Sequence, residues 1–159
     1  MVSAPPTTDN AFPVGEFAGL PIHQAFVGTC TNGRLEDIEI AARILRGRRV
    51  AEGVRFYVSP TSRPVLEAAV RSGAVQALVE AGAIFLMAAC GPCVSMTGNG
   101  VLADGERTVT SANRNFPGRL GSKKAEIFLA SPATVAASAL TGRLTDPREA
   151  LAETEGAAR

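Results

Sequence analysis

The sequence predicts an α/β fold, a three-layer α/β/α domain with a mostly parallel sheet. Short apolar segments alternate with longer amphipathic segments along most of the chain. This alternation is typical of strand–helix–strand units, in which helices cover parallel strands. The chain has 159 residues, of which 46% are hydrophobic and 19% charged. A chain of this length and composition is expected to fold around one buried core.

The first predicted unit begins with the apolar strand Gln24–Gly28. A turn-rich loop, Thr29–Arg34, leads into a helix predicted over Leu35–Leu45. Apolar residues recur at helical spacing in that helix, and Gly47 is a suitable residue for its C-terminal cap.

The second unit repeats this order. A strand at Val54–Val58 precedes two helical stretches, Pro64–Ser72 and Val75–Ala81, and proline suits the first turn of a helix. A third strand, Ala83–Met87, runs directly into the loop Ala88–Ser95.

The last part of the predicted domain has two more strands and a helix. The strands are expected near Thr108–Thr110 and Glu126–Leu129, and the loop Ser111–Arg119 follows the first of them. Ser131 opens the final helix and Gly142 closes it. We place the domain over residues 12–146, with a flexible tail at 1–11 and a C-terminal tail, either a frayed helix or a linker, at 147–159.

Charge and cysteine content narrow the function classes. The formal net charge of +1 argues against broad binding to nucleic acid or anionic lipid. No apolar run approaches the ~20 residues that span a bilayer, and no secretory signal is visible. Three cysteines make a disulfide framework a poor hypothesis, so we expect a cytoplasmic protein with metal-binding or catalytic cysteines.

The three loops named above are expected to meet at one end of the sheet. Ligands of open α/β sheets bind beyond the carboxyl ends of the strands. These loops hold Cys30, Cys90 and Cys93, together with the only dense cluster of asparagine and arginine. Cys30 also lies one turn before a helix, where the helix dipole favours the thiolate that binds metal.

Several simpler interpretations of the cysteines remain open. They are compatible with three unrelated buried thiols. Cys90-Gly91-Pro92-Cys93 is also a thiol redox tetrapeptide, although Ala89 precedes it and the chain contains no tryptophan. A structural zinc site needs a fourth ligand, and the only histidine, His23, is at the other end of the first strand from Cys30. Three thiolates would instead suit an iron–sulfur cluster with one open iron.

Four segments in order resemble the aconitase superfamily. They are GTCTNGRLEDIEIAA (Gly28–Ala42), AACGPCVSM (Ala88–Met96), TSANRNFPGRLGS (Thr110–Ser122) and FLASPATVAASALTG (Phe128–Gly142). The resemblance covers about residues 8–146. It extends to the large subunits of 3-isopropylmalate dehydratase and homoaconitase, which are hydro-lyases. Only the third, C-terminal domain of those subunits is matched.

The resemblance implies a [4Fe-4S] cluster bound by Cys30, Cys90 and Cys93. It implies that Arg114 and Arg119 contact the carboxylates of a di- or tricarboxylic hydroxyacid. Guanidinium groups suit carboxylates because they bind them bidentately. Asn113 and Asn32 would lie beside the cluster, although Asn32 can equally be a turn former or a helix cap.

The resemblance also implies partners. In the family, the first two domains and a small swivelling subunit supply the groups that move protons, and we find no convincing catalytic acid or base in this chain. It would be inactive alone and would act with those domains, most simply in the isomerisation of isopropylmalate in leucine biosynthesis. A homoaconitase or aconitase type hydratase is the alternative. A non-catalytic iron–sulfur, zinc or redox protein is an alternative of another class.

Overall fold

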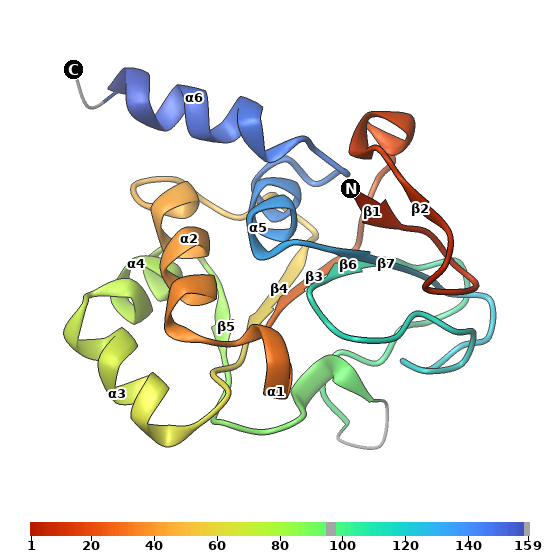
Figure 1. Cartoon of the computed structure of the whole chain (residues 1–159), viewed down its shortest axis with the longest axis horizontal. Coiled ribbons are helices and arrows are strands. Elements are labelled where there is room, and N and C mark those ends of the chain that lie inside the picture. Colours follow the sequence, from red (N-terminus) through yellow and green to blue (C-terminus); the bar gives the residue numbers. More distant parts are fainter. Residues whose placement is uncertain (95–97, 158–159) are drawn as a thin grey trace.

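The computed structural model describes residues 1–94 and 98–157, and side chains as far as residue 152. Its sheet has seven strands in the order β2-β1-β7-β6-β3-β4-β5 (Figure 1). The strands are β1 Val2–Ser3, β2 Ala11–Phe12, β3 Gln24–Val27, β4 Arg55–Val58, β5 Ile84–Phe85, β6 Arg107–Thr110 and β7 Glu126–Ala130. The helices are η1 Val14–Phe17, α1 Thr29–Asn32, α2 Leu35–Leu45, α3 Arg63–Arg71, α4 Ala74–Glu80, η2 Gly91–Cys93, α5 Pro132–Thr141 and α6 Pro147–Ala157.

Five consecutive strands of the sheet are parallel. β3 pairs in parallel with β4 and β6, β4 with β5, and β6 with β7. Only the short strands β1 and β2 run antiparallel to their neighbours. The predicted α/β class and the mostly parallel sheet are therefore confirmed.

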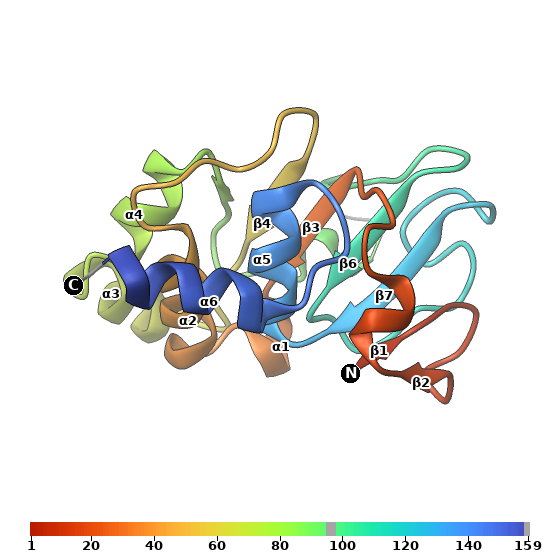
Figure 2. The ribbon, with the colours of Figure 1, turned by 90° about the horizontal axis from the view of Figure 1, so that it is seen from above.

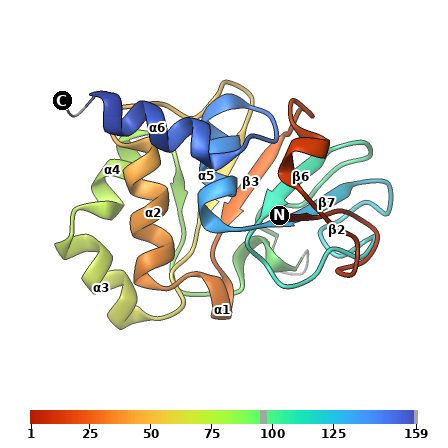
Figure 3. The same cartoon turned by 45° about the horizontal axis from the view of Figure 1, so that its top comes forward.

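The helices form one layer around α2, which contacts each of α3, α4, α5 and α6 (Figure 3). They pack on the alternate strand residues that face them, such as Ala25, Val27 and Phe128, in the main hydrophobic core. α2 has the predicted bounds because its apolar face is continuous, with Ile38 and Ala41 fully buried. The helix α5 likewise begins after its predicted cap, Ser131. The hydroxyl of Ser131 accepts a hydrogen bond from Thr134 N at 3.2 Å.

The second face of the sheet is covered differently. A smaller core of Leu102, Leu120, Ala125 and Ile127 lies there. Among the described residues, η2 and long loops provide this third layer in place of regular helices (Figure 2). The strands therefore bury side chains on both faces, although only one face carries the helices.

The N-terminal segment differs from the predicted flexible tail. Val2 pairs with Ala130 of β7 and is 1% exposed. Asn115 also holds this segment, because its side-chain amide donates to Ala4 O at 3.1 Å and Thr7 O at 3.2 Å. The strand β1 has only two residues, too few to show a period in the sequence. Only its pairing with the distant strand β7 defines it. At the other end, the predicted C-terminal tail takes the helical one of its two expected forms, as α6, in which Ala150 is buried.

The amino ends of the strands carry the main half-buried ion pair. Arg55 donates two hydrogen bonds of 2.9 Å to the carboxylate of Glu106. These bonds, more than simple charge attraction, hold the pKa of Glu106 below its ordinary value. The pair is at the opposite end of the strands from the predicted site. No helix among residues 1–94 and 98–157 is long and apolar enough to cross a bilayer.

Candidate functional site

The candidate site lies where the direction of strand succession reverses. β3 is central, with β4 and β5 on one side and β6 and β7 on the other. The neighbouring strands β3 and β6 are therefore followed by loops that lead away in opposite directions. Open α/β sheets bind ligands at the carboxyl ends of two such strands.

Cys30 lies in α1, the single turn directly after β3, and its side chain is exposed. The residue before it, Thr29, has a positive φ of 91°, which is costly for a β-branched residue. The Thr29 hydroxyl accepts hydrogen bonds from Thr31 N at 3.3 Å and Asn32 N at 3.5 Å, which stabilise the turn. This conformation fixes where the chain presents Cys30.

The Cys30 turn is hydrogen-bonded to the loop after β6. The buried Ser111 accepts from Gly28 N at 3.0 Å through its hydroxyl. Asn32 Nδ2 donates to Ser111 O at 2.6 Å, and Thr31 Oγ1 donates to Asn113 Oδ1 at 2.6 Å. Asn32 and Asn113 thus join the two predicted site loops, whatever else they contact.

Cys90 directly precedes the short turn η2, and Cys93 is its last residue. This turn covers the second face of the sheet. Cys90 is exposed and Cys93 partly so. A pocket of about 210 Å³ is lined by both Cys30 and Cys90, together with Thr61, Ala88 and Ala89. Two of the three predicted ligands therefore line one cavity, although they are 60 residues apart (90 − 30).

Cys93 is in contact with one of the predicted arginines. Arg119 Nε donates to Cys93 O at 2.8 Å, and its Nη2 lies 3.7 Å from Cys93 Sγ. The guanidinium carbon is also 5.6 Å from the centre of the Phe116 ring, a cation–π arrangement. The Arg119 side chain therefore ties the loop after β6 to the loop that carries Cys93.

The other predicted arginine is placed differently. Arg114 is exposed and, within the described residues, its guanidinium has no hydrogen-bond or ion-pair partner. It follows Asn113, whose side chain contacts the Cys30 turn. Arg114 is therefore available to an incoming anion, whereas Arg119 already supports Cys93.

The donor set suits an iron–sulfur cluster better than one bound ion. Within the described residues, no three His, Cys, Asp or Glu side chains form a group that could hold a single metal ion. One loop presents Cys30 and another presents Cys90 and Cys93, and thiolates are the usual ligands of iron–sulfur clusters.

The remaining predicted residues are also accounted for. His23 precedes β3, and its Nδ1 accepts from Arg107 N at 3.0 Å, so it is at the opposite end of that strand from Cys30. Ser95 and Met96, at the end of the predicted Cys90 loop and motif, lie outside the described residues.

Sequence reasoning missed two buried hydroxyls that organise the loops, Ser59 and Ser111. Each directly follows a parallel strand, β4 and β6 respectively. A polar residue immediately after an apolar strand was the available signal, because that position faces the carboxyl-end site.

The loops approach one another closely because glycine occupies two positions. A Cβ at Gly28 would lie 2.7 Å from Ser59 O, and one at Gly33 only 2.4 Å from the same atom. We expect Gly33→Ala to lower the free energy of unfolding by about 1–3 kcal/mol, the usual cost of overpacking. Chemical denaturation would measure the loss.

The matched control for that substitution is Gly15→Ala, since no atom lies within 4 Å of a Cβ built there. Gly15→Ala should leave the midpoint of chemical denaturation nearly unchanged. If both alanine variants were equally stable, the close approach of the loop to Ser59 would have no energetic consequence.

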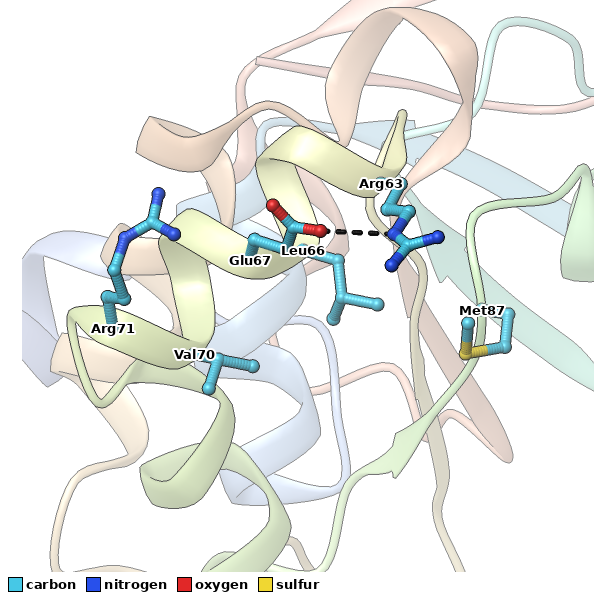
Figure 4. Close-up of a pocket in the computed structure, with 6 residues that line it drawn as sticks. All are labelled: Arg63, Leu66, Glu67, Val70, Arg71 and Met87. Carbon is cyan, nitrogen blue, oxygen red and sulfur yellow. Dashed lines mark hydrogen bonds and ion pairs between the residues drawn. The ribbon is translucent and has the colours of Figure 1, made fainter.

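A larger groove lies beside the cysteine pocket rather than in it. It has a volume of about 510 Å³ and is lined by α3 and by Met87 (Figure 4). Val70 and Met87 are strongly exposed along it, and Arg63 at its edge is paired with Glu67. The groove contains none of the predicted site residues.

Comparison with known proteins identifies related chains. The model of the aconitase family (aconitate hydratase) matches residues 8–142. The 3-isopropylmalate dehydratase large subunit 2 of Archaeoglobus fulgidus is 53% identical over 151 residues, which cover 95% of this chain and 36% of that protein. The homoaconitase large subunit of Thermus thermophilus is 51% identical over 148 residues, covering 93% and 35%. The chain thus spans about a third of the length of these curated relatives.

Proposed function

This chain belongs to the aconitase family, and from that premise we propose that it is the cluster-bearing domain of a [4Fe-4S] hydro-lyase. The observation that carries the proposal is the meeting of the three loops at the carboxyl end of the sheet. Cys30 and Cys90 line one pocket there, and Arg119 contacts Cys93.

Cys30, Cys90 and Cys93 would hold the cluster. With three protein ligands, such a cluster leaves one iron free to act as a Lewis acid on a substrate oxygen. The protein's own contribution is to present the thiolates in fixed positions. Arg119 holds the Cys93 backbone through a hydrogen bond, and the hydrogen bonds of Ser111 and Asn32 hold the Cys30 turn in place.

Arg114 would bind a carboxylate of the substrate. Its side chain is exposed beside the Cys30 turn, and a guanidinium group pairs with a carboxylate through two parallel hydrogen bonds. The proposed substrate class is a di- or tricarboxylic hydroxyacid. Isopropylmalate is the first candidate, which would place the domain in leucine biosynthesis.

Reversible dehydration needs a base for the carbon-bound proton and an acid for the leaving hydroxyl. Among the described residues, Asn113 and Arg114 are exposed near the Cys30 turn, and neither side chain is an ordinary acid or base. We propose that this domain works in the cytoplasm with chains or domains equivalent to the other two thirds of its relatives, and with a small subunit. Alone it would be inactive.

The test of this proposal is reconstitution followed by complementation. Anaerobic treatment with iron and sulfide should give roughly four irons and four sulfides per chain. The loaded chain, combined with the missing domains and the small subunit, should then convert isopropylmalate. Complete lack of conversion of isopropylmalate, homoaconitate and aconitate by a cluster-loaded complex would contradict the hydro-lyase assignment.

Homoaconitate hydration is the second candidate within the same class. The homoaconitase relative is nearly as similar as the dehydratase relative, at 51% against 53% identity. A side-by-side assay of the two substrates on the same complex separates them. A non-catalytic cluster carrier would load iron and sulfide but restore no activity in any complex.

A further inference from the structure

Ser59 occupies the space between the two cysteine loops. It follows β4, the strand between β3 and β5, and it is fully buried. Its hydroxyl oxygen lies 3.1 Å from both Met87 O and Ala89 O, so its single proton is shared between these two carbonyls. These carbonyls belong to the segment that leads directly into Cys90, so one buried hydroxyl holds that segment against the end of β4.

The backbone of Ser59 contacts the other cysteine loop. Ser59 N donates to Val27 O at 2.9 Å, at the end of the strand that leads to Cys30. Its carbonyl oxygen is the atom that any Cβ at Gly28 or Gly33 would meet within 2.7 Å. Two residues further on, Thr61 N donates to Gly33 O at 2.9 Å. The Cys30 turn therefore packs directly on the backbone of this segment.

We propose that Ser59 is a positioning residue that sets the separation between Cys30 and Cys90. The Cys30 turn packs on the backbone of Ser59, and the hydroxyl of Ser59 is hydrogen-bonded to the segment that leads into Cys90. Thr61, in the same segment, lines the pocket between the two cysteines. The proposal deepens the cluster-binding role proposed above and rests on it, because a cluster requires its thiolates at fixed spacing.

The test compares Ser59→Ala with Ser138→Ala in the full chain. Ser138 is also fully buried, and its hydroxyl donates to Thr134 O at 2.7 Å inside α5. Both variants lose one buried hydroxyl, but only Ser59 contacts the Cys90 segment. Ser59→Thr keeps a hydroxyl and should restore the wild-type behaviour.

The first readout uses the chain without iron. Amide exchange in the peptide 86–93 should become about fivefold faster or more in Ser59→Ala, as expected for loss of one hydrogen bond. It should stay within twofold of wild type in Ser138→Ala. This measurement does not depend on a cluster, so it decides the positioning role even if no cluster assembles.

The second readout uses the reconstituted chain. Ser59→Ala should lose its visible absorption several times faster in air than Ser138→Ala, and its electron paramagnetic resonance spectrum should change. Equal cluster lifetimes and equal exchange in the two variants would overturn the proposal. Global unfolding of Ser59→Ala, with Ser138→Ala still folded, would also overturn it, because Ser59 would then support the whole domain. Failure of wild type to bind a cluster would refute the proposed function alone.

Discussion

Serine in place of Cys30 is expected to abolish cluster assembly, lowering bound iron from roughly four per chain to near zero. The hydroxyl of serine stays protonated at neutral pH, so the proposed cluster would lose one of its three thiolate ligands. The thiol of Cys30 is exposed and makes no contribution to the core. Thermal unfolding of the iron-free chain should therefore be nearly unchanged.

Iron and sulfide analysis after anaerobic reconstitution, with the visible absorption spectrum, measures this effect. Thr61→Ser is the matched control, because Thr61 lines the same pocket and its hydroxyl is kept. It should bind iron as wild type does. Undiminished iron in Cys30→Ser would remove Cys30 from the ligand set.

Other results would support the alternatives for the cysteines. Stoichiometric zinc without sulfide would favour a structural metal site. A reversible disulfide between Cys90 and Cys93, with reductase activity toward insulin, would favour a redox protein.

Lysine in place of Arg114 is expected to lower the activity of the complemented enzyme by roughly tenfold to a hundredfold, with the cluster intact. Lysine keeps the positive charge but loses the second, parallel hydrogen bond to a carboxylate. Charge-assisted hydrogen bonds of this kind contribute roughly 1.5–3 kcal/mol. Because Arg114 is exposed, the substitution should not affect folding.

Steady-state kinetics of the complex, with iron content measured on the same samples, would test this expectation. Arg107→Lys is the control, since Arg107 opens β6 at the opposite end of the strand and pairs there with Glu126. Arg114 is a cleaner target than Arg119, because replacing Arg119 would also remove its hydrogen bond to Cys93 O. Full activity in Arg114→Lys would exclude it from the substrate site.

Much of the parallel core could be predicted from sequence because its signals are local. The bounds of α2 follow from an unbroken apolar face, and the start of α5 from the Ser131 cap. The predicted bounds of β3, β4, β6 and β7 each lie within about two residues of the observed ones, because these segments are rich in the β-branched and aromatic residues that favour strands.

The rest depends on contacts between distant residues. β1 is defined only by its pairing with β7, and η2 by the loop packing on the second face of the sheet. The positive φ of Thr29 could not be predicted either, because β-branched residues avoid it. For the candidate site, the sequence predicted which loops meet. It did not predict the hydroxyls of Ser59 and Ser111 that hold the loops together.

The placement of β1 has a consequence for biosynthesis. Val2 is synthesised well before Ala130, its partner in the sheet. At ordinary rates of about 5–20 residues per second, β1 must wait several seconds for β7 to emerge. Meanwhile β3 and β4, close together in sequence, can pair as soon as both have left the exit tunnel. β1 thus precedes every other strand of this sheet in the sequence and is among the last of them to find its place.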